Sequence, residues 1–124
     1  MSDYVKKKVL RFPLSKEILK GKDKYDWVED MENKHPKVFN SQGINTFEPS
    51  DTEEDYLDYV LEYSYGEESG DYGYTWKLTE KEKEKYEPLF SKLLPNIDMD
   101  KVHKVIYCYY NCCESPDYYE IQED

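Results

Sequence analysis

The stretch LDYVLEYSY (residues 57–65) is the part of the sequence that most strongly decides the fold. Its alternate residues are large and apolar or aromatic, namely Leu57, Tyr59, Leu61, Tyr63 and Tyr65. A period of two is typical of a β-strand with one buried face. We therefore predict a strand here, with Asp58 and Glu62 projecting from the opposite, solvent-facing side.

A second alternating stretch follows after a segment rich in glycine and acidic residues. Tyr72, Tyr74, Trp76 and Leu78 alternate with smaller or polar residues. Consecutive strands joined by a glycine-containing segment often pair as a hairpin. The sequence thus predicts an antiparallel hairpin with an acidic tip, whose buried face carries Tyr59, Leu61, Tyr63, Tyr74 and Trp76.

Further strands are indicated near both ends of the chain. Residues 5–12 are rich in Val, Leu and aromatic residues, which predicts a first strand with Lys6, Lys7 and Lys8 on its more exposed part. Residues 102–113 are apolar on both faces, as in a central strand. A turn at residues 115–117 then predicts a return at residues 118–122 as an edge strand.

Helix caps mark two short helices after the first strand. Ser15 is placed to cap a helix that runs through Leu19, with Gly21 stopping it. Asp23 is placed to cap a second helix, which Pro36 ends. Residues 37–50 contain glycine, proline and polar residues, so we predict a loop there.

A third helix is predicted after the hairpin. Thr79 and Glu82 have the spacing of a capping box, and apolar residues then recur at helical spacing up to Leu94. Pro88 lies inside this pattern, so the helix should kink or restart near Glu87.

The fold class that follows is α+β, with a small antiparallel sheet of about four to five strands and two to three helices packed on it. Residues 1–124 form a single acidic domain, since neither a repeat nor a linker divides the chain. A mean hydropathy of -1.02 and a net charge of -11 are typical of disordered chains. The twenty aromatic residues, fourteen of them Tyr, indicate instead a folded core rich in tyrosine.

Charge is segregated along the chain. Residues 48–75 contain ten acidic residues and no Lys or Arg, so nearly all of the net charge lies there. Like charge kept together opposes folding but speeds association with an oppositely charged partner. The predicted partner-binding residues are Asp51, Glu53, Glu54, Asp55, Tyr56, Asp58, Glu62, Glu67, Glu68, Asp71 and Tyr72.

These features favour a non-catalytic binding protein that inhibits or regulates a nuclease or another nucleic-acid-binding protein by occluding its basic site. In surface character alone, the chain resembles small acidic inhibitors that mimic nucleic acid. These include phage anti-restriction and anti-CRISPR proteins and the immunity proteins of nuclease toxins. The comparison rests on charge and size, because no motif matches one such family. An accessory or structural protein with a merely solvated acidic face is the first alternative.

The second alternative is a small metal-binding protein or enzyme built on Cys108, Cys112, Cys113 and His103. Their spacing differs from that of zinc knuckles, and neither histidine is placed beside a nucleophile. We therefore expect packed, reduced cysteines and no enzyme activity, metal or cofactor.

Other partner classes are disfavoured by composition. The only basic cluster comprises Lys6, Lys7, Lys8 and Arg11, which we interpret as the exposed part of a strand, so direct nucleic-acid binding is not expected. The chain has neither an apolar run that could cross a bilayer nor a secretory signal. A cytoplasmic location is the corresponding expectation.

Overall fold

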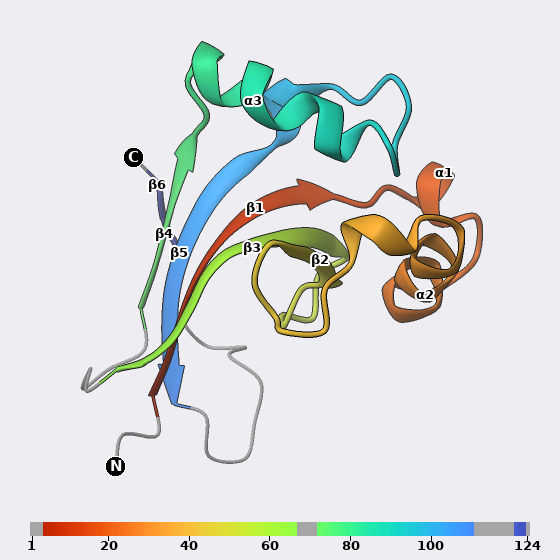
Figure 1. The fold of residues 1–124 in the computed structure, drawn as a ribbon. Helices are drawn as coiled ribbons and strands as arrows, with labels where there is room; N and C mark the ends of the chain where they lie inside the picture. The colour runs from red at the N-terminus through yellow and green to blue at the C-terminus, as the bar shows by residue number, and fades with distance from the viewer. Residues whose placement is uncertain (1–3, 67–71, 111–120, 124) are drawn as a thin grey trace.

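The computed structural model describes residues 4–66, 72–110 and 121–123 (Figure 1). Over these ranges the chain has the predicted α+β architecture, a mainly antiparallel sheet with helices at its ends. In chain order the elements are β1 (Tyr4–Pro13), α1 (Lys16–Leu19), α2 (Lys24–Lys34), the 3-10 helix η1 (Pro36–Val38), β2 (Thr46–Pro49), β3 (Tyr56–Gly66), β4 (Tyr72–Lys77), α3 (Glu80–Phe90), the 3-10 helix η2 (Met99–Lys101), β5 (His103–Tyr110) and β6 (Ile121–Glu123).

The order of the strands in the sheet is β2-β3-β1-β5-β4-β6. Neighbouring strands are antiparallel except β4 and β6, which are parallel. The predicted hairpin of β3 and β4 is therefore wrong, because β1 and β5 lie between them (Figure 1). Alternation identifies a strand but not its neighbour, and the two strands with buried residues on both faces take the centre.

β1 and β5 are confirmed as strands, and both are central. Val5 and Leu10 of β1 lie on opposite faces and are fully buried. In β5, Tyr107 and Cys108 are consecutive residues, and both are fully buried. Residues 111–113 of the predicted central strand and 118–120 of the predicted edge strand lie outside the described residues, but β6 does form an edge.

A bulge changes which residues of β3 share a face. Lys8 pairs with Glu62 and Val9 with Val60, so Leu61 is the extra residue. Beyond it the alternation is inverted, and Tyr59 packs in one core cluster while Tyr63 packs against the other. The single buried face predicted for residues 57–65 is therefore wrong.

The larger core cluster joins the helices to one face of the sheet. It contains Trp27 and Val28 of α2 together with Phe90, whose ring lies 5.1 Å from that of Phe47 in a T-shaped contact. The smaller cluster occupies the other face and contains Val5, Val9, Val60, Val105 and Tyr107. In Figure 1, α1 and α2 lie beyond the end of β1, and α3 lies near the ends of β4 and β5.

The predicted helix starts are confirmed by their caps. Ser15 accepts a hydrogen bond from Ile18 N, and Asp23 accepts one from Asp26 N. Gly21, with a φ of +85°, adopts the left-handed conformation just after α1. The capping box of Thr79 and Glu82 is also formed.

Two details of the helix and loop predictions are wrong. The helix α3 continues through Pro88 and ends at Phe90, so the predicted extension to Leu94 is wrong and the helix does not restart near Glu87, whereas a kink there stays a prediction. The predicted loop at residues 37–50 contains η1 and the edge strand β2. Four residues are too few to show a period, and the terminal Pro49 obscured the strand.

The aromatic residues of β4 are less buried than predicted. Tyr74 is 42% exposed, and Trp76 is only partly buried. Their rings stack with centroids 6.0 Å apart. Because the hairpin does not form, these side chains do not pack against β3, and replacing Trp76 should cost less than the 3–5 kcal/mol typical of a fully buried large aromatic.

Candidate partner-binding surface

The acidic loop, defined here as residues 50–55, connects β2 to β3 and is tied down at both ends. Ser50 N donates to Tyr56 O at 3.0 Å, and Tyr56 N donates to Glu54 O at 3.1 Å. Leu14 N, just after β1, donates to Asp55 O at 2.8 Å. These backbone bonds fix the path of the loop against the sheet.

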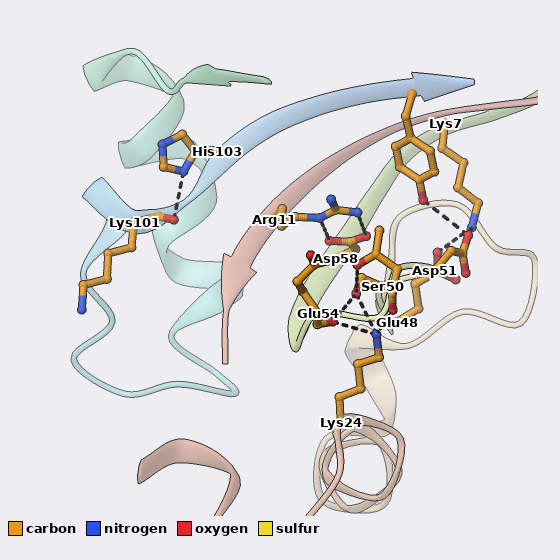
Figure 2. Close-up of polar contacts among 12 residues, drawn as sticks. Lys7, Arg11, Lys24, Glu48, Ser50, Asp51, Glu54, Asp58, Lys101 and His103 are labelled. Atoms are coloured by element: carbon orange, nitrogen blue, oxygen red, sulfur yellow. Dashed lines mark hydrogen bonds and ion pairs between the residues drawn. The ribbon is translucent and has the colours of Figure 1, made fainter. Parts of the chain in front are cut away.

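Lys7 joins β1 to β2 and to the acidic loop. Its side chain is 6% exposed, and its Nζ lies 2.9 Å from Glu48 Oε1 and 2.6 Å from Asp51 Oδ2 (Figure 2). Tyr107 OH donates to the same Asp51 oxygen at 3.4 Å. Burial alone would lower the pKa of Lys7, but the two carboxylates raise it, so the ammonium stays charged.

The pair of Arg11 and Asp58 is buried more deeply. Arg11 Nε donates to Asp58 Oδ1 at 2.8 Å and Nη2 to Oδ2 at 2.9 Å, a bidentate arrangement. The guanidinium also lies 4.9 Å from the ring centroid of Tyr56. Asp58 is 0% exposed, so the prediction that it projects to solvent is wrong. The bulge and the strand pairing turn it toward Arg11, away from any partner.

Lys24, at the first position of α2, donates hydrogen bonds to the acidic loop. The residue is 3% exposed. Its Nζ donates to Ser50 Oγ at 3.0 Å, to Glu54 O at 2.8 Å and to Thr52 O (Figure 2). Burial lowers the pKa of Lys24, while nearby carboxylates, Asp55 foremost, oppose that shift.

The outward side chains of the loop are acidic. Glu53, Glu54 and Asp55 are consecutive and exposed, and within the described part of the chain none of them forms an ion pair. Glu62 is also exposed, with its carboxylate 3.9 Å from Lys8 Nζ. These four predicted residues are therefore accessible to a partner.

The remaining predicted residues divide into two groups. Asp51 and Tyr56 are partly buried and contact Lys7 and Arg11 respectively. Glu67, Glu68 and Asp71 lie outside the described residues, and Tyr72 begins β4 with a side chain that is not described.

The Cys and His alternative gains no support from the geometry of β5. His103 and Cys108 are five residues apart on one strand, so they lie on opposite faces and about 16 Å apart. His103 Nδ1 lies 3.2 Å from Lys101 O (Figure 2). Among the described residues, no group of three or more His, Cys, Asp or Glu could hold a metal ion. Cys112 and Cys113 lie outside those residues.

Sequence reasoning missed the cations that organise this surface. Lys7 and Arg11 were interpreted as exposed, yet they share strand parity with the buried Val5 and Val9. Basic residues on the same strand face as buried valines, together with a distant segment that has acidic but no basic residues, indicate ion pairs between the two segments. Lys24 carried no comparable signal, because the first turn of a helix is ordinarily solvated.

Comparison of the chain with models of protein families, with curated proteins and with solved structures gives no match. In the ranges that the structure describes, none of the helices is long and apolar enough to span a membrane. The functional conclusion therefore depends on the geometry of the acidic loop and its neighbours.

Proposed function

We propose that this protein is a non-catalytic binding protein whose acidic loop docks on the basic site of a nuclease or another nucleic-acid-binding protein. The observation that carries the proposal is the run of Glu53, Glu54 and Asp55, which are exposed and form no ion pair with the described residues, on a loop whose backbone is held by hydrogen bonds. Carboxylates presented in this way can occupy positions where a partner otherwise holds phosphates. Occlusion of that site would inhibit the partner.

Physical reasoning favours recognition over solvation for these three residues. Adjacent like charges repel one another, and solubility is served equally well by interspersed charge. A surface that is already ordered loses less conformational freedom on binding than a flexible one. The fixed backbone of the acidic loop therefore favours a role in association.

An aromatic anchor lies beside the acidic loop. Tyr25 is 59% exposed, and its ring centroid lies 5.4 Å from the Nζ of Lys24, the group that also binds the loop carbonyls. Tyrosine is enriched among residues that dominate binding energy, because its ring is large and rigid. Tyr25 suits the role of an aromatic anchor better than the predicted partner-binding residue Tyr56, because Tyr56 is partly buried against Arg11.

The test is competition for a nucleic-acid site. Purified restriction endonucleases, CRISPR effector nucleases and nuclease toxins are each loaded with fluorescent DNA or RNA, and the protein is titrated in. We expect displacement from at least one of them, with an association rate that falls steeply as salt is raised from about 0.01 to 0.15 M.

A matched pair of variants localises the effect. The loop variant Glu53→Gln, Glu54→Gln, Asp55→Asn removes the three exposed charges and should weaken displacement at least about tenfold. The control variant Glu29→Gln, Glu84→Gln, Glu87→Gln removes three exposed charges from the helices. Equal weakening in both variants would show a bulk-charge effect and contradict the proposal. Lack of displacement by the unmodified protein across the panel would favour a solvated acidic face.

A further inference from the structure

Lys24 is a buried ammonium with an unusual set of contacts. An ammonium carries three donors, and three oxygens surround this one, namely Ser50 Oγ and the carbonyl oxygens of Thr52 and Glu54. Ser50 Oγ also donates to Glu54 O at 3.1 Å and lies 3.2 Å from Thr52 Oγ1. The oxygens thus converge on one cation, and none of those in hydrogen-bond contact belongs to a carboxylate.

Burying the ammonium of Lys24 costs free energy, which the surrounding groups must offset. Removing a charge from water is unfavourable, and burial is the largest influence on the pKa of Lys24. Asp55, Asp58 and Asp51 offset part of that cost through their fields without touching the ammonium. The three hydrogen bonds satisfy the donors of the ammonium, and two of them are made to carbonyl groups of the acidic loop.

The direction of these carbonyl groups determines where the loop side chains lie. Because Thr52 O and Glu54 O turn inward to Lys24, the loop backbone is held on its inner side. The side chains of Glu53, Glu54 and Asp55 remain exposed on its outer side. Without an internal cation, the inward carbonyl dipoles and the nearby carboxylates would repel one another, and the loop should loosen.

We propose that Lys24 is a positioning residue, an internal cation that orders the acidic loop and thereby presents its carboxylates to a basic partner. The binding half of this inference rests on the proposed function, whereas the ordering half does not. Because Lys24 is only 3% exposed, it acts through the loop and not by touching the partner.

The ordering role is tested by hydrogen exchange at the three backbone amides whose hydrogen bonds hold the acidic loop, namely those of Leu14, Ser50 and Tyr56. In Lys24→Met, which keeps most of the side-chain volume but removes the charge, we expect these amides to exchange at least about tenfold faster, with the amides of β1 and β5 unchanged. The control is Lys22→Met, which removes an exposed lysine that pairs with Asp30. Unchanged loop exchange in Lys24→Met would overturn the proposal.

Chemical rescue keeps the test decisive if the methionine variant folds poorly. Lys24→Ala removes three methylenes and the ammonium, which together correspond to n-propylammonium. Adding this ion should restore slow exchange in the loop, whereas an equal concentration of sodium chloride should not. Restoration by both salts alike would show general ionic stabilisation and contradict a specific cation site.

Binding of a fluorescent nona-arginine peptide tests whether Lys24, by ordering the acidic loop, strengthens binding to a basic partner. Losing a positive charge should tighten binding of a cationic peptide by bulk electrostatics, as we expect for Lys22→Met. The positioning role predicts the opposite for Lys24→Met, with binding weaker than in Lys22→Met by about threefold or more. Equal binding by the two variants would overturn the positioning role.

The loop variant of the preceding section, measured in the same assay, separates the two proposals. If it binds the peptide as tightly as the unmodified protein, the acidic loop is not the binding surface, and the proposed function is wrong. If it binds more weakly while Lys24→Met matches Lys22→Met, only the role of Lys24 is wrong.

Discussion

Residues 48–58 contain two sets of carboxylates, an inward set that forms ion pairs and an outward set that is exposed. In the inward set, Glu48 and Asp51 form ion pairs with Lys7 of β1. The third member, Asp58, pairs with Arg11 of the same strand. The outward set consists of Glu53, Glu54 and Asp55, which lie between Asp51 and Asp58 in the sequence. These three residues are exposed and form no ion pair in the described ranges. The same residue types in one segment therefore stabilise the fold in one set and remain available for binding in the other.

This difference shows that the net charge counted along a segment does not give the charge that the segment exposes at the protein surface. Residues 48–75 contain no basic residue, but β1 supplies two from more than forty positions away. Their pairing removes Asp58 from the accessible surface, whereas Glu53, Glu54 and Asp55 of the acidic loop remain exposed. Among the described residues, the proposed binding surface therefore contains fewer of these carboxylates than the sequence predicts.

Replacing Arg11 tests the inward set most severely. Arg11→Met leaves the carboxylate of Asp58 buried and unpaired, which should lower the free energy of unfolding by about 3–5 kcal/mol. Urea denaturation measures the loss. The double variant Arg11→Met, Asp58→Leu removes both charges and should recover most of it. A double variant as unstable as the single one would show that packing, not charge pairing, dominates at this site.

Lys7→Met should have a smaller effect, about 1–3 kcal/mol, because the Glu48 and Asp51 side chains are 28% and 30% exposed and remain partly hydrated. Burial raises the pKa of Glu48 above its unfolded value. A raised carboxyl pKa destabilises the fold at neutral pH, and that cost disappears as pH falls through the folded value. The cost of Lys7→Met should therefore shrink at acid pH, as denaturation at pH 7 and at pH 4 would reveal. A pH-independent cost would contradict this assignment.

Glu82 provides an intermediate case, neither buried nor free. Hydrogen bonds from Lys104 and from the backbone of Thr79 lower its pKa below the ordinary value of 4.5. A lowered carboxyl pKa contributes stability that is present above the unfolded value and lost as pH falls through the folded one. Glu82→Gln should therefore cost about 0.5–1 kcal/mol at pH 7 and progressively less in acid. Thermal melts of Glu84→Gln, an exposed residue of the same helix, give the baseline.

The outward set should contribute least to stability. The loop variant Glu53→Gln, Glu54→Gln, Asp55→Asn should change the free energy of unfolding by less than about 0.5 kcal/mol, with a slight gain from reduced repulsion. Urea denaturation at low salt measures it. A loss above about 1 kcal/mol would place these carboxylates in structural contacts and erase the contrast with the inward set.

Local features of the sequence predicted local features of the structure. The caps at Ser15, Asp23 and Thr79 are set by hydrogen bonds within a few residues, and all three are formed. The strands β1, β3, β4 and β5 were also recognisable, because alternation and apolar content act over one segment. The exposed positions of Glu53, Glu54 and Asp55 follow from the same local logic.

The errors in strand order and side-chain burial concern pairing between distant segments. The neighbours of β3, the bulge at Leu61 and the burial of Asp58 all depend on β1, and short-range alternation contains none of that information. Lys24 depends on a loop that starts twenty-six positions later. The strand order, the bulge and the contacts of Lys24 follow from how the segments pair and pack, and only the alignment of Lys7 and Arg11 with buried valines gave a sequence signal of such pairing.

The position of β1 at the centre of the sheet has a consequence for synthesis. β1 is made before its partner β5, and the two strands are far apart along the chain, since Tyr4 pairs with Tyr110. One edge of β1 therefore stays open until β5 has been translated. Pairing over such a separation is slow, and an open strand edge is prone to aggregate in the meantime. The nascent chain should thus depend on chaperones until β5 closes the sheet.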